Sequence, residues 1–181
     1  TVTFPADFIL VAAMNPCPCG NFGSNTPCVC QPNNLIRYQR KISGPIMDRI
    51  DLWVEVGKID SSKLSKENES GSRNESTAIK TRVALAQKFQ SERFKNEPEN
   101  LKINRDMSAK NIVRLCNITK NAMHLLTQSA EKLNLSPRSF HRSMKLARTI
   151  ADLDGNQNVE ERHVLEALQY RPKSQLLGAN C

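Results

Sequence analysis

The first third of the chain is patterned like β-strands separated by polar breaks. Residues 8–14 (FILVAAM) are continuously apolar and stop at Asn15, followed by proline, which predicts a short buried strand. Residues 51–56 alternate between polar and apolar side chains, which predicts a second strand with one apolar face. Two strands are too few to make a stable sheet of their own. We therefore expect both to complete a larger α/β structure.

The pattern changes to a helical period in the second half of the chain. Residues 58–75 are polar and rich in serine, which predicts a flexible linker between two domains. Beyond them, apolar residues recur every three or four positions, as in amphipathic helices. A small helical bundle is therefore expected over residues 76–171, with a tail over residues 172–181. Its helices are predicted to begin at polar caps, namely Ser76, Ser108, Thr119, Ser136 and Asn158.

The balance of charge is basic. The 181 residues include 26 Lys and Arg against 18 Asp and Glu, which gives a net charge of +8 and a pI near 9.4. This favours polyanionic partners such as nucleic acid or a nucleotide, although a solvated basic surface has the same composition. No apolar stretch approaches the roughly 20 residues of a membrane-spanning helix, so we expect no membrane partner.

Four of the six cysteines lie in a loop rich in Pro, Gly and Asn, residues 16–34. With no secretory leader in the sequence, this clustering favours a cytoplasmic protein with a metal site over a disulfide framework. Four thiolates suit a tetrahedral, structural Zn²⁺ ion. Four reduced, metal-free thiols are an equal alternative, because C-x-C is tighter than the commoner C-x-x-C spacing. The candidate metal ligands are Cys17, Cys19, Cys28 and Cys30.

Three polar side chains stand where a phosphate would be contacted. Asn15 ends the first predicted strand, and α/β sheets bind ligands at that edge. Arg49 lies between a proline-started turn and the second strand. There its guanidinium could bind a phosphate through two parallel hydrogen bonds, or act as an arginine finger in a neighbouring active site. Arg138 follows a Ser-Pro helix start, where free amides and the helix dipole favour anions.

Each of these positions also has a simpler structural interpretation. An asparagine before proline is typical of a turn. Arg49 could form a weak surface pair with Asp48 or Asp51. The helix that carries Arg138 could be an ordinary amphipathic helix, and its further cations at positions 142, 145 and 148 are expected on a solvated outer face.

Four sequence blocks resemble magnesium-chelatase-like AAA+ ATPases, and within them the competence-associated ComM (YifB) group. The blocks are AAMNPCPCG, SGPIMDRIDL, LSPRSFHRSMKLARTIADL and HVLEALQYR. Within that family, the true chelatase I subunits are known to lack the cysteine-bearing insertion. Its presence here favours the ComM-like branch. The resemblance implies that Asn15 is sensor 1, which positions the attacking water. It implies that Arg49 is the arginine finger, acting on ATP of the adjacent subunit, and that Arg138 is sensor 2, contacting the γ-phosphate.

The resemblance also implies an α/β plus all-α fold. Residues 1–57 would be the C-terminal remnant of a parallel AAA+ sheet, and residues 76–171 the helical lid. The implied cofactors are ATP and Mg²⁺, and the implied partners are the other subunits of a homohexameric ring and DNA, in a branch-migration motor of natural transformation. No G-x-x-x-x-G-K-[ST] loop and no strand ending in paired acids occurs in the sequence. We therefore expect a piece of a longer ATPase that is monomeric and does not hydrolyse ATP by itself.

Two other functions remain open from the sequence. The first is a stand-alone, zinc-dependent nucleic-acid-binding module that uses the cysteine loop with Arg37, Arg40 and Lys41. Against it, Tyr38 is the only aromatic residue near those cations, whereas stacking platforms interleave several. The second is a chelatase-type motor subunit that acts on a protein partner.

Overall fold

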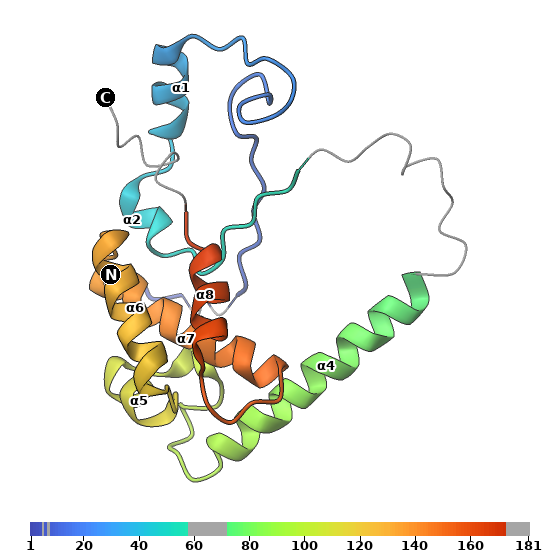
Figure 1. Cartoon of the computed structure of the whole chain (residues 1–181), viewed down its shortest axis with the longest axis vertical. Coiled ribbons are helices and arrows are strands. Elements are labelled where there is room, and N and C mark those ends of the chain that lie inside the picture. Colours follow the sequence, from blue (N-terminus) through green and yellow to red (C-terminus); the bar gives the residue numbers. More distant parts are fainter. Residues whose placement is uncertain (5, 7, 58–71, 173–181) are drawn as a thin grey trace.

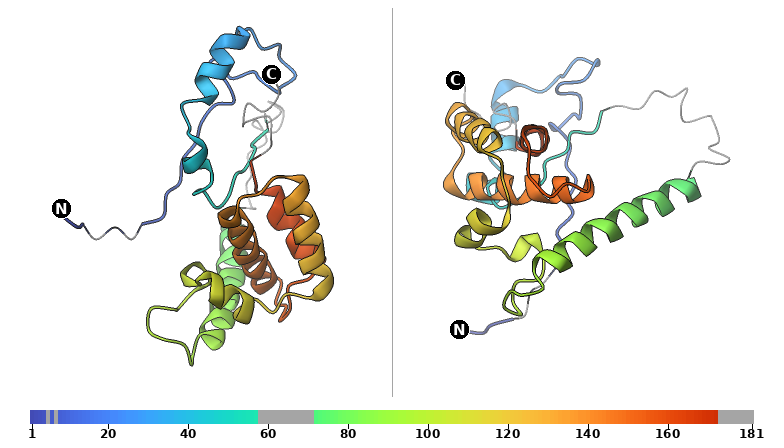
Figure 2. Two further views of the ribbon diagram at one scale, coloured as in Figure 1. Left: turned by 90° about the vertical axis from the view of Figure 1, so that its left-hand side faces the viewer. Right: turned by 60° about the horizontal axis from the view of Figure 1, so that its bottom comes forward.

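A computed structural model describes residues 1–57, except 5 and 7, and residues 72–172 (Figure 1, Figure 2). Most of the predicted linker (58–71) and of the predicted tail (173–181) therefore lies outside the described residues. The described elements are helical: α1 (Pro32–Gln39), α2 (Gly44–Met47), α4 (Ser72–Arg93), the 3₁₀ turn η1 (Asn104–Asp106), α5 (Ala109–Leu115), α6 (Lys120–Lys132), α7 (Pro137–Leu153) and α8 (Glu161–Gln169).

The later helices form one bundle around α7, which confirms the helical part of the expected fold. α7 packs against α8 and α4, and α6 packs against α8. The core contains buried apolar side chains from α5, α6, α7 and α8, including Ile112, Leu126, Met144, Ala147 and Val164. None of the helices in the described residues has both the length and the apolar character needed to cross a membrane.

Local capping explains where three helices begin. The side-chain oxygens of Ser108, Thr119 and Ser136 each accept a hydrogen bond from the backbone N–H three residues later, at 3.3, 3.2 and 3.1 Å. These bonds satisfy amide groups that a helix start leaves without an intrahelical partner. The three predicted starts are therefore confirmed.

The last helix begins later than predicted. Its N-cap is Glu160, whereas the sequence indicated Asn158. Val159 instead forms an isolated parallel bridge with Ile118, and its N–H donates to the carbonyl of Asn117 at 2.9 Å. A residue held in extended pairing cannot also start a helix, so this long-range contact shifts the boundary.

α4 extends away from the bundle along much of its length (Figure 1). It begins at Ser72, before the predicted cap at Ser76. Apolar residues recur along α4 at helical spacing and form a stripe, of which Ala86 is buried, but Ile79 and Val83 are 53% and 43% exposed. The stripe is therefore covered only where α4 reaches α7.

The predicted strands do not form a sheet in the described part of the chain. Residues 8–14 and 51–56 belong to no strand, and the side chains from Phe8 to Val11 are 68–88% exposed. A strand needs the backbone groups of a neighbouring strand, and these two segments do not supply them to each other. The N–H of Trp53 donates instead to the carbonyl of Tyr170, at 3.0 Å, next to the end of α8. The sheet remnant is thus not shown.

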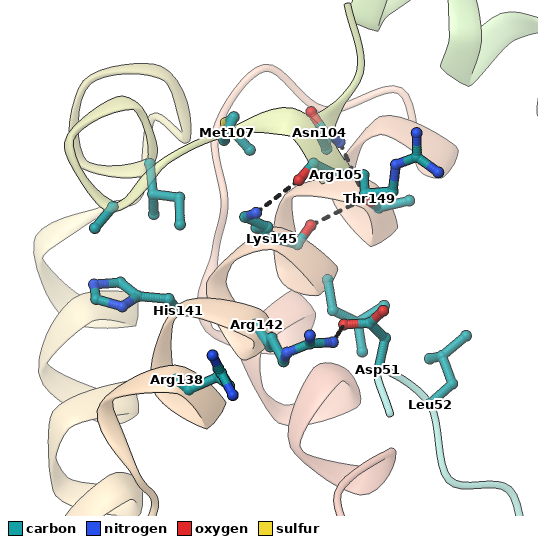
Figure 3. Close-up of a pocket in the computed structure, with 13 residues that line it drawn as sticks. Asp51, Leu52, Asn104, Arg105, Met107, Arg138, His141, Arg142, Lys145 and Thr149 are labelled. Atoms are coloured by element: carbon teal, nitrogen blue, oxygen red, sulfur yellow. Dashed lines mark hydrogen bonds and ion pairs between the residues drawn. The ribbon is translucent and has the colours of Figure 1, made fainter. Parts of the chain in front are cut away.

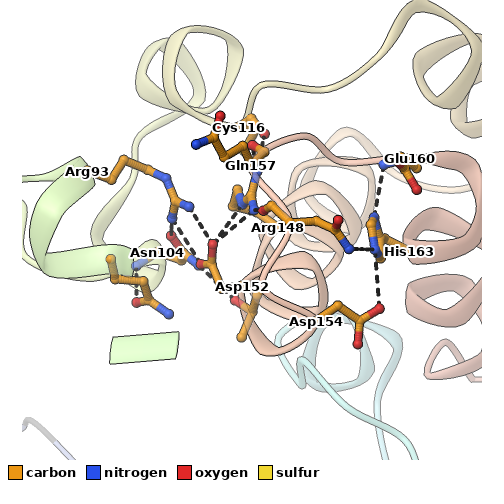
Figure 4. Close-up of polar contacts among 12 residues, drawn as sticks. Arg93, Asn104, Cys116, Arg148, Asp152, Asp154, Gln157, Glu160 and His163 are labelled. Atoms are coloured by element: carbon orange, nitrogen blue, oxygen red, sulfur yellow. Dashed lines mark hydrogen bonds and ion pairs between the residues drawn. The ribbon is translucent and has the colours of Figure 1, made fainter. Parts of the chain in front are cut away.

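A buried ionic network joins α4, η1 and α7 (Figure 4). The carboxylate of Asp152 accepts hydrogen bonds from Arg93, from Asn104 at 2.9 Å and from Arg148 at 3.1 Å. Arg148 is fully buried, so its predicted place on a solvated outer face is wrong. It is tolerated there because its remaining donors reach backbone carbonyls, those of Cys116, Asn156 and Gln157.

Candidate functional site

The start of α7 forms one wall of a basic pocket (Figure 3). The pocket has a volume of about 520 Å³. Arg138 is exposed beside it, directly after the Pro137 that begins the helix. Four of the lining residues are basic and one is acidic: Arg105, Arg138, Arg142, Lys145 and Asp51. The excess of cations, beside amide groups at a helix start, makes this pocket suited to an anion.

Burial changes the pKa of one of these basic side chains, that of Lys145. The ammonium of Lys145 donates a hydrogen bond to the backbone carbonyl of Arg105 at 2.7 Å. Desolvation lowers the pKa of Lys145, and the neighbouring Arg142 guanidinium lowers it further.

The segment that carries Arg49 is bound to the same helix start. The hydroxyl of Ser139 donates to the carboxylate of Asp48 at 3.0 Å, and Arg142 forms an ion pair with Asp51. We call these two contacts the α7 latch. They correct the simpler interpretation of Arg49, because the neighbouring acids bind α7 and not the arginine between them.

A second set of contacts holds the same segment to the end of α8. The buried guanidinium of Arg171 donates to the carbonyl of Ile50 at 3.1 Å and to that of Asp51. Desolvation lowers the pKa of Arg171. Arg49 itself stays exposed, with one guanidinium nitrogen donating to the carbonyl of Pro45 at 2.8 Å. The structure therefore presents Arg49 to solvent from a segment fixed at both of its sides.

Asn15 lies on a different part of the molecule. It is exposed at the end of the extended segment, and its backbone carbonyl accepts a hydrogen bond from the hydroxyl of Tyr38 on α1, at 3.0 Å. Within the described residues no hydrogen bond links Asn15 to Arg49 or Arg138. The structure thus brings the segment of Arg49 to the helix of Arg138, but it does not add Asn15 to them.

The four loop cysteines converge on one point, as the sequence predicted for a metal site. The sulfur of Cys17 lies 3.3 Å from that of Cys19 and 3.8 Å from that of Cys28, and the sulfurs of Cys19 and Cys28 are 3.6 Å apart. With Cys30 included, all four sulfurs lie within 4.8 Å of one another, and all four are free thiols. This cluster could bind zinc.

The surroundings of the cluster shift the pKa values of its thiols in opposite directions. The N–H groups of Asn21 and Val29 lower the pKa of Cys19 to about 6. Burial raises the pKa of Cys30 to about 12. The turn that folds the loop back needs Gly20, whose φ of +79° lies in the left-handed region that other residues avoid.

Sequence reasoning missed the residues that hold these groups in place. Ser139 and Asp48, like Arg142 and Asp51, are 91 residues apart, so no local pattern indicates their contacts. Arg171 likewise reaches back 120 residues to the carbonyl of Asp51. Only Tyr38 had a signal, since it is the one aromatic residue among the cations that follow the cysteine loop.

Two family models together match most of the chain. Residues 73–171 match the family described as magnesium chelatase, subunit ChlI C-terminal, which covers more than half of the 181 residues. Residues 1–64 match the family described as magnesium chelatase, subunit ChlI.

Curated relatives show the same family relationship. The chain is 38% identical to competence protein ComM of Haemophilus influenzae and 36% identical to the protein YifB of Escherichia coli K12, each over 97% of this chain and 33% of the relative. It is 32% identical to protein Mb2921c of Mycobacterium bovis, over 93% of this chain and 32% of the relative. The chain therefore spans about a third of the length of these relatives. Together with the family matches, these similarities establish that the chain belongs to the magnesium chelatase ChlI C-terminal family, in its ComM- and YifB-like branch.

Proposed function

We propose that this chain is the sensor and lid portion of an AAA+ ATPase, with Asn15 as sensor 1, Arg49 as arginine finger and Arg138 as sensor 2. The family membership suggests an AAA+ protein that uses a nucleotide with Mg²⁺ and assembles into oligomers. The observation that carries the residue roles is the α7 latch, because it places an exposed arginine and a helix-start arginine on one connected unit.

Each of the three residues would contribute through its own chemistry. Bound ATP supplies the phosphoanhydride that is hydrolysed. The Asn15 amide would accept from and donate to the attacking water and so orient it. Arg138 would bind the γ-phosphate of the same subunit's nucleotide at the positive end of α7. Arg49 would stabilise the charge that develops on the phosphate bound by the neighbouring subunit.

The latch gives a route from one nucleotide site to the next. A lid that shifts when Arg138 loses its phosphate would carry the Arg49 segment with it, because Asp48 and Asp51 are bound to α7. In this proposal residues 1–57 complete the AAA+ sheet, residues 76–171 are the lid, and the linker between them is the joint. The exposed apolar run over residues 8–11 supports it, since such a surface calls for a covering sheet.

We expect this chain alone to bind ATP no better than millimolar and not to hydrolyse it. Arg49 and Arg138 contact only the terminal phosphate in the proposal, and the sequence lacks a glycine-rich lysine loop to cradle the others. A titration with fluorescent ATP, with and without Mg²⁺, measures this. Micromolar binding together with Mg²⁺-dependent turnover by this chain would contradict the proposed division of roles.

The partner we propose for the whole protein is DNA, in a hexameric branch-migration motor of natural transformation. The net charge of +8 supports a polyanionic partner, and one relative is named as a competence protein. Forked and duplex DNA should therefore stimulate ATP hydrolysis by the full-length protein. Equal turnover with and without DNA, at low salt, would point instead to a motor that acts on a protein.

A second candidate function is a nucleic-acid-binding module. It is favoured by two exposed cations near the cysteine cluster: Arg37 lies on α1, the helix that follows the cluster, and Arg40 lies just after that helix. If it were the main function, the chain alone would shift single-stranded DNA with an affinity that falls steeply with salt. We expect only weak binding, because the single aromatic residue there, Tyr38, is occupied by Asn15 and by Lys41, whose ammonium lies 5.7 Å from the ring centre. A series of electrophoretic shift measurements from about 50 to about 200 mM salt distinguishes a nucleic-acid-binding module from the ATPase portion proposed above.

A further inference from the structure

We propose that Cys17, Cys19, Cys28 and Cys30 bind one Zn²⁺ ion, and that this zinc centre fixes the position of Asn15. The metal site itself stands on the geometry of the sulfurs. The consequence for Asn15 rests in addition on the sensor role proposed above.

The sulfur separations are those of a tetrahedral site. Four sulfurs at the usual Zn–S distance of about 2.3 Å lie about 3.8 Å from one another. The distances of 3.3, 3.6 and 3.8 Å among Cys17, Cys19 and Cys28 are close to this value. They are far longer than the roughly 2.05 Å of a disulfide bond. A cation between the sulfurs explains why four thiols gather without pairing.

The loop has little else to hold it together. Among residues 16–31 only Cys17 is fully buried, and the loop lies with α1 at one end of the molecule, away from the helical bundle (Figure 1, Figure 2). A segment without a hydrophobic core is typically stabilised by a disulfide or a metal. Since all four cysteines are free thiols, the metal is the remaining source of stability.

Backbone amides complete the site. The N–H of Phe22 donates to the sulfur of Cys17 at 3.4 Å. Four thiolates around one Zn²⁺ carry a net charge of −2, and such N–H···S contacts offset it. Outer hydrogen bonds of this kind orient metal ligands and tune their basicity.

Two segments connect this metal centre to Asn15: the chain just before Cys17, and the helix α1 after Cys30. Along the chain it precedes Cys17 by two residues. Across space its carbonyl is held by the hydroxyl of Tyr38, on the helix α1 that starts two residues after Cys30. Metal binding would thus fix both the loop and the helix between which Asn15 is held. Tyr38 is therefore a positioning residue for Asn15.

The metal site is tested by metal analysis of this chain, purified without a metal-binding tag. We expect one zinc per chain, four thiols protected from alkylation until a chelator is added, and the visible bands of tetrahedral cobalt after exchange with Co²⁺. Cys28→Ser should lose the metal. Cys116→Ser is the matched control, because Cys116 is buried in the bundle, and it should keep one zinc. Less than about a tenth of an equivalent of metal, with four reactive thiols and an intact helical circular dichroism spectrum, would overturn the site.

The positioning role is tested by backbone ¹⁵N relaxation at Asn15. In the zinc-loaded chain we expect its amide to be as ordered as those of α1, and to lose this order both on chelation and in Tyr38→Phe. Tyr170→Phe, which alters a long hydrogen bond of 3.5 Å to Glu166, should change neither. If zinc binds but Asn15 keeps its order in Tyr38→Phe, the positioning role is wrong. The zinc site and the ATPase assignment would be untouched by that outcome, because neither depends on Tyr38.

Discussion

Replacing Arg49 by alanine in the full-length protein is expected to lower kcat for ATP hydrolysis by about 10³- to 10⁵-fold, with ATP affinity nearly unchanged. An arginine that reaches into a neighbouring site stabilises charge that appears only in the transition state, so its loss affects turnover and not ground-state binding. Arg49 is exposed, and its segment is held by Asp48 and Asp51, so the side chain can be removed without unfolding the site.

The matched control is Arg162→Ala, because this arginine is 60% exposed and forms only surface ion pairs with Asp154 and Glu160. Arg49→Lys separates charge from shape: an ammonium cannot form the two parallel bonds of a guanidinium, so activity should stay low. Mixing Arg49→Ala subunits with wild-type subunits should lower activity at least in proportion to their share, since each finger serves one site in the next subunit. Full hydrolysis by Arg49→Ala, measured by phosphate release at saturating ATP, would remove Arg49 from the site.

The parts of the fold that follow from local chemistry were predictable. Ser136 followed by Pro137 marks the start of α7, and Thr119 marks that of α6, because capping and the fixed φ of proline act within a few residues. α1 was not predicted, although Pro32 lies at its first turn, because the helix has only 8 residues and buries none of them.

Long-range contacts defeated the other predictions. Arg148 has the spacing of a solvated cation, but its acceptors are carbonyls of a loop that only the folded bundle brings near. Residues 8–14 read as a buried strand, and their apolar character is real, yet burial needs partner strands that the described residues do not include. The sequence pattern thus identified which residues are candidates, but their partners and burial depend on tertiary contacts that the local pattern does not contain.

The cysteines show the same division. The two C-x-C pairs indicated the candidate metal ligands from sequence alone, and the structure brings all four sulfurs together. The hydrogen bond between Tyr38 and Asn15, which links the cluster to the nucleotide site in our proposal, spans 23 residues and left no pattern in the sequence.

Replacing Asp152 by alanine is expected to lower the free energy of unfolding by about 3–5 kcal/mol, the usual cost of removing one partner of a buried ion pair. Asp152 is 1% exposed, and its single carboxylate forms ion pairs with both Arg148 and Arg93 while accepting from Asn104 (Figure 4). Without it, two guanidinium groups remain in the bundle with no counter-charge, and Arg148, at 0% exposure, cannot reach water. For a bundle of this size the melting temperature should fall by more than about 10 °C.

Urea unfolding of this chain, followed by helical circular dichroism, measures the loss. Glu97→Ala is the matched control: it also removes a carboxylate from an arginine, Arg114 at 2.6 Å, but that arginine's side chain is 56% exposed, so the loss should be about 1 kcal/mol or less. Asp152→Asn keeps an acceptor oxygen while deleting the charge, so it should fall between the two and still fold if the alanine variant does not. Equal losses in Asp152→Ala and Glu97→Ala would mean that hydrogen bonds to backbone carbonyls alone are enough to stabilise the buried Arg148. The buried carboxylate would then not be what allows a cation inside the helical bundle.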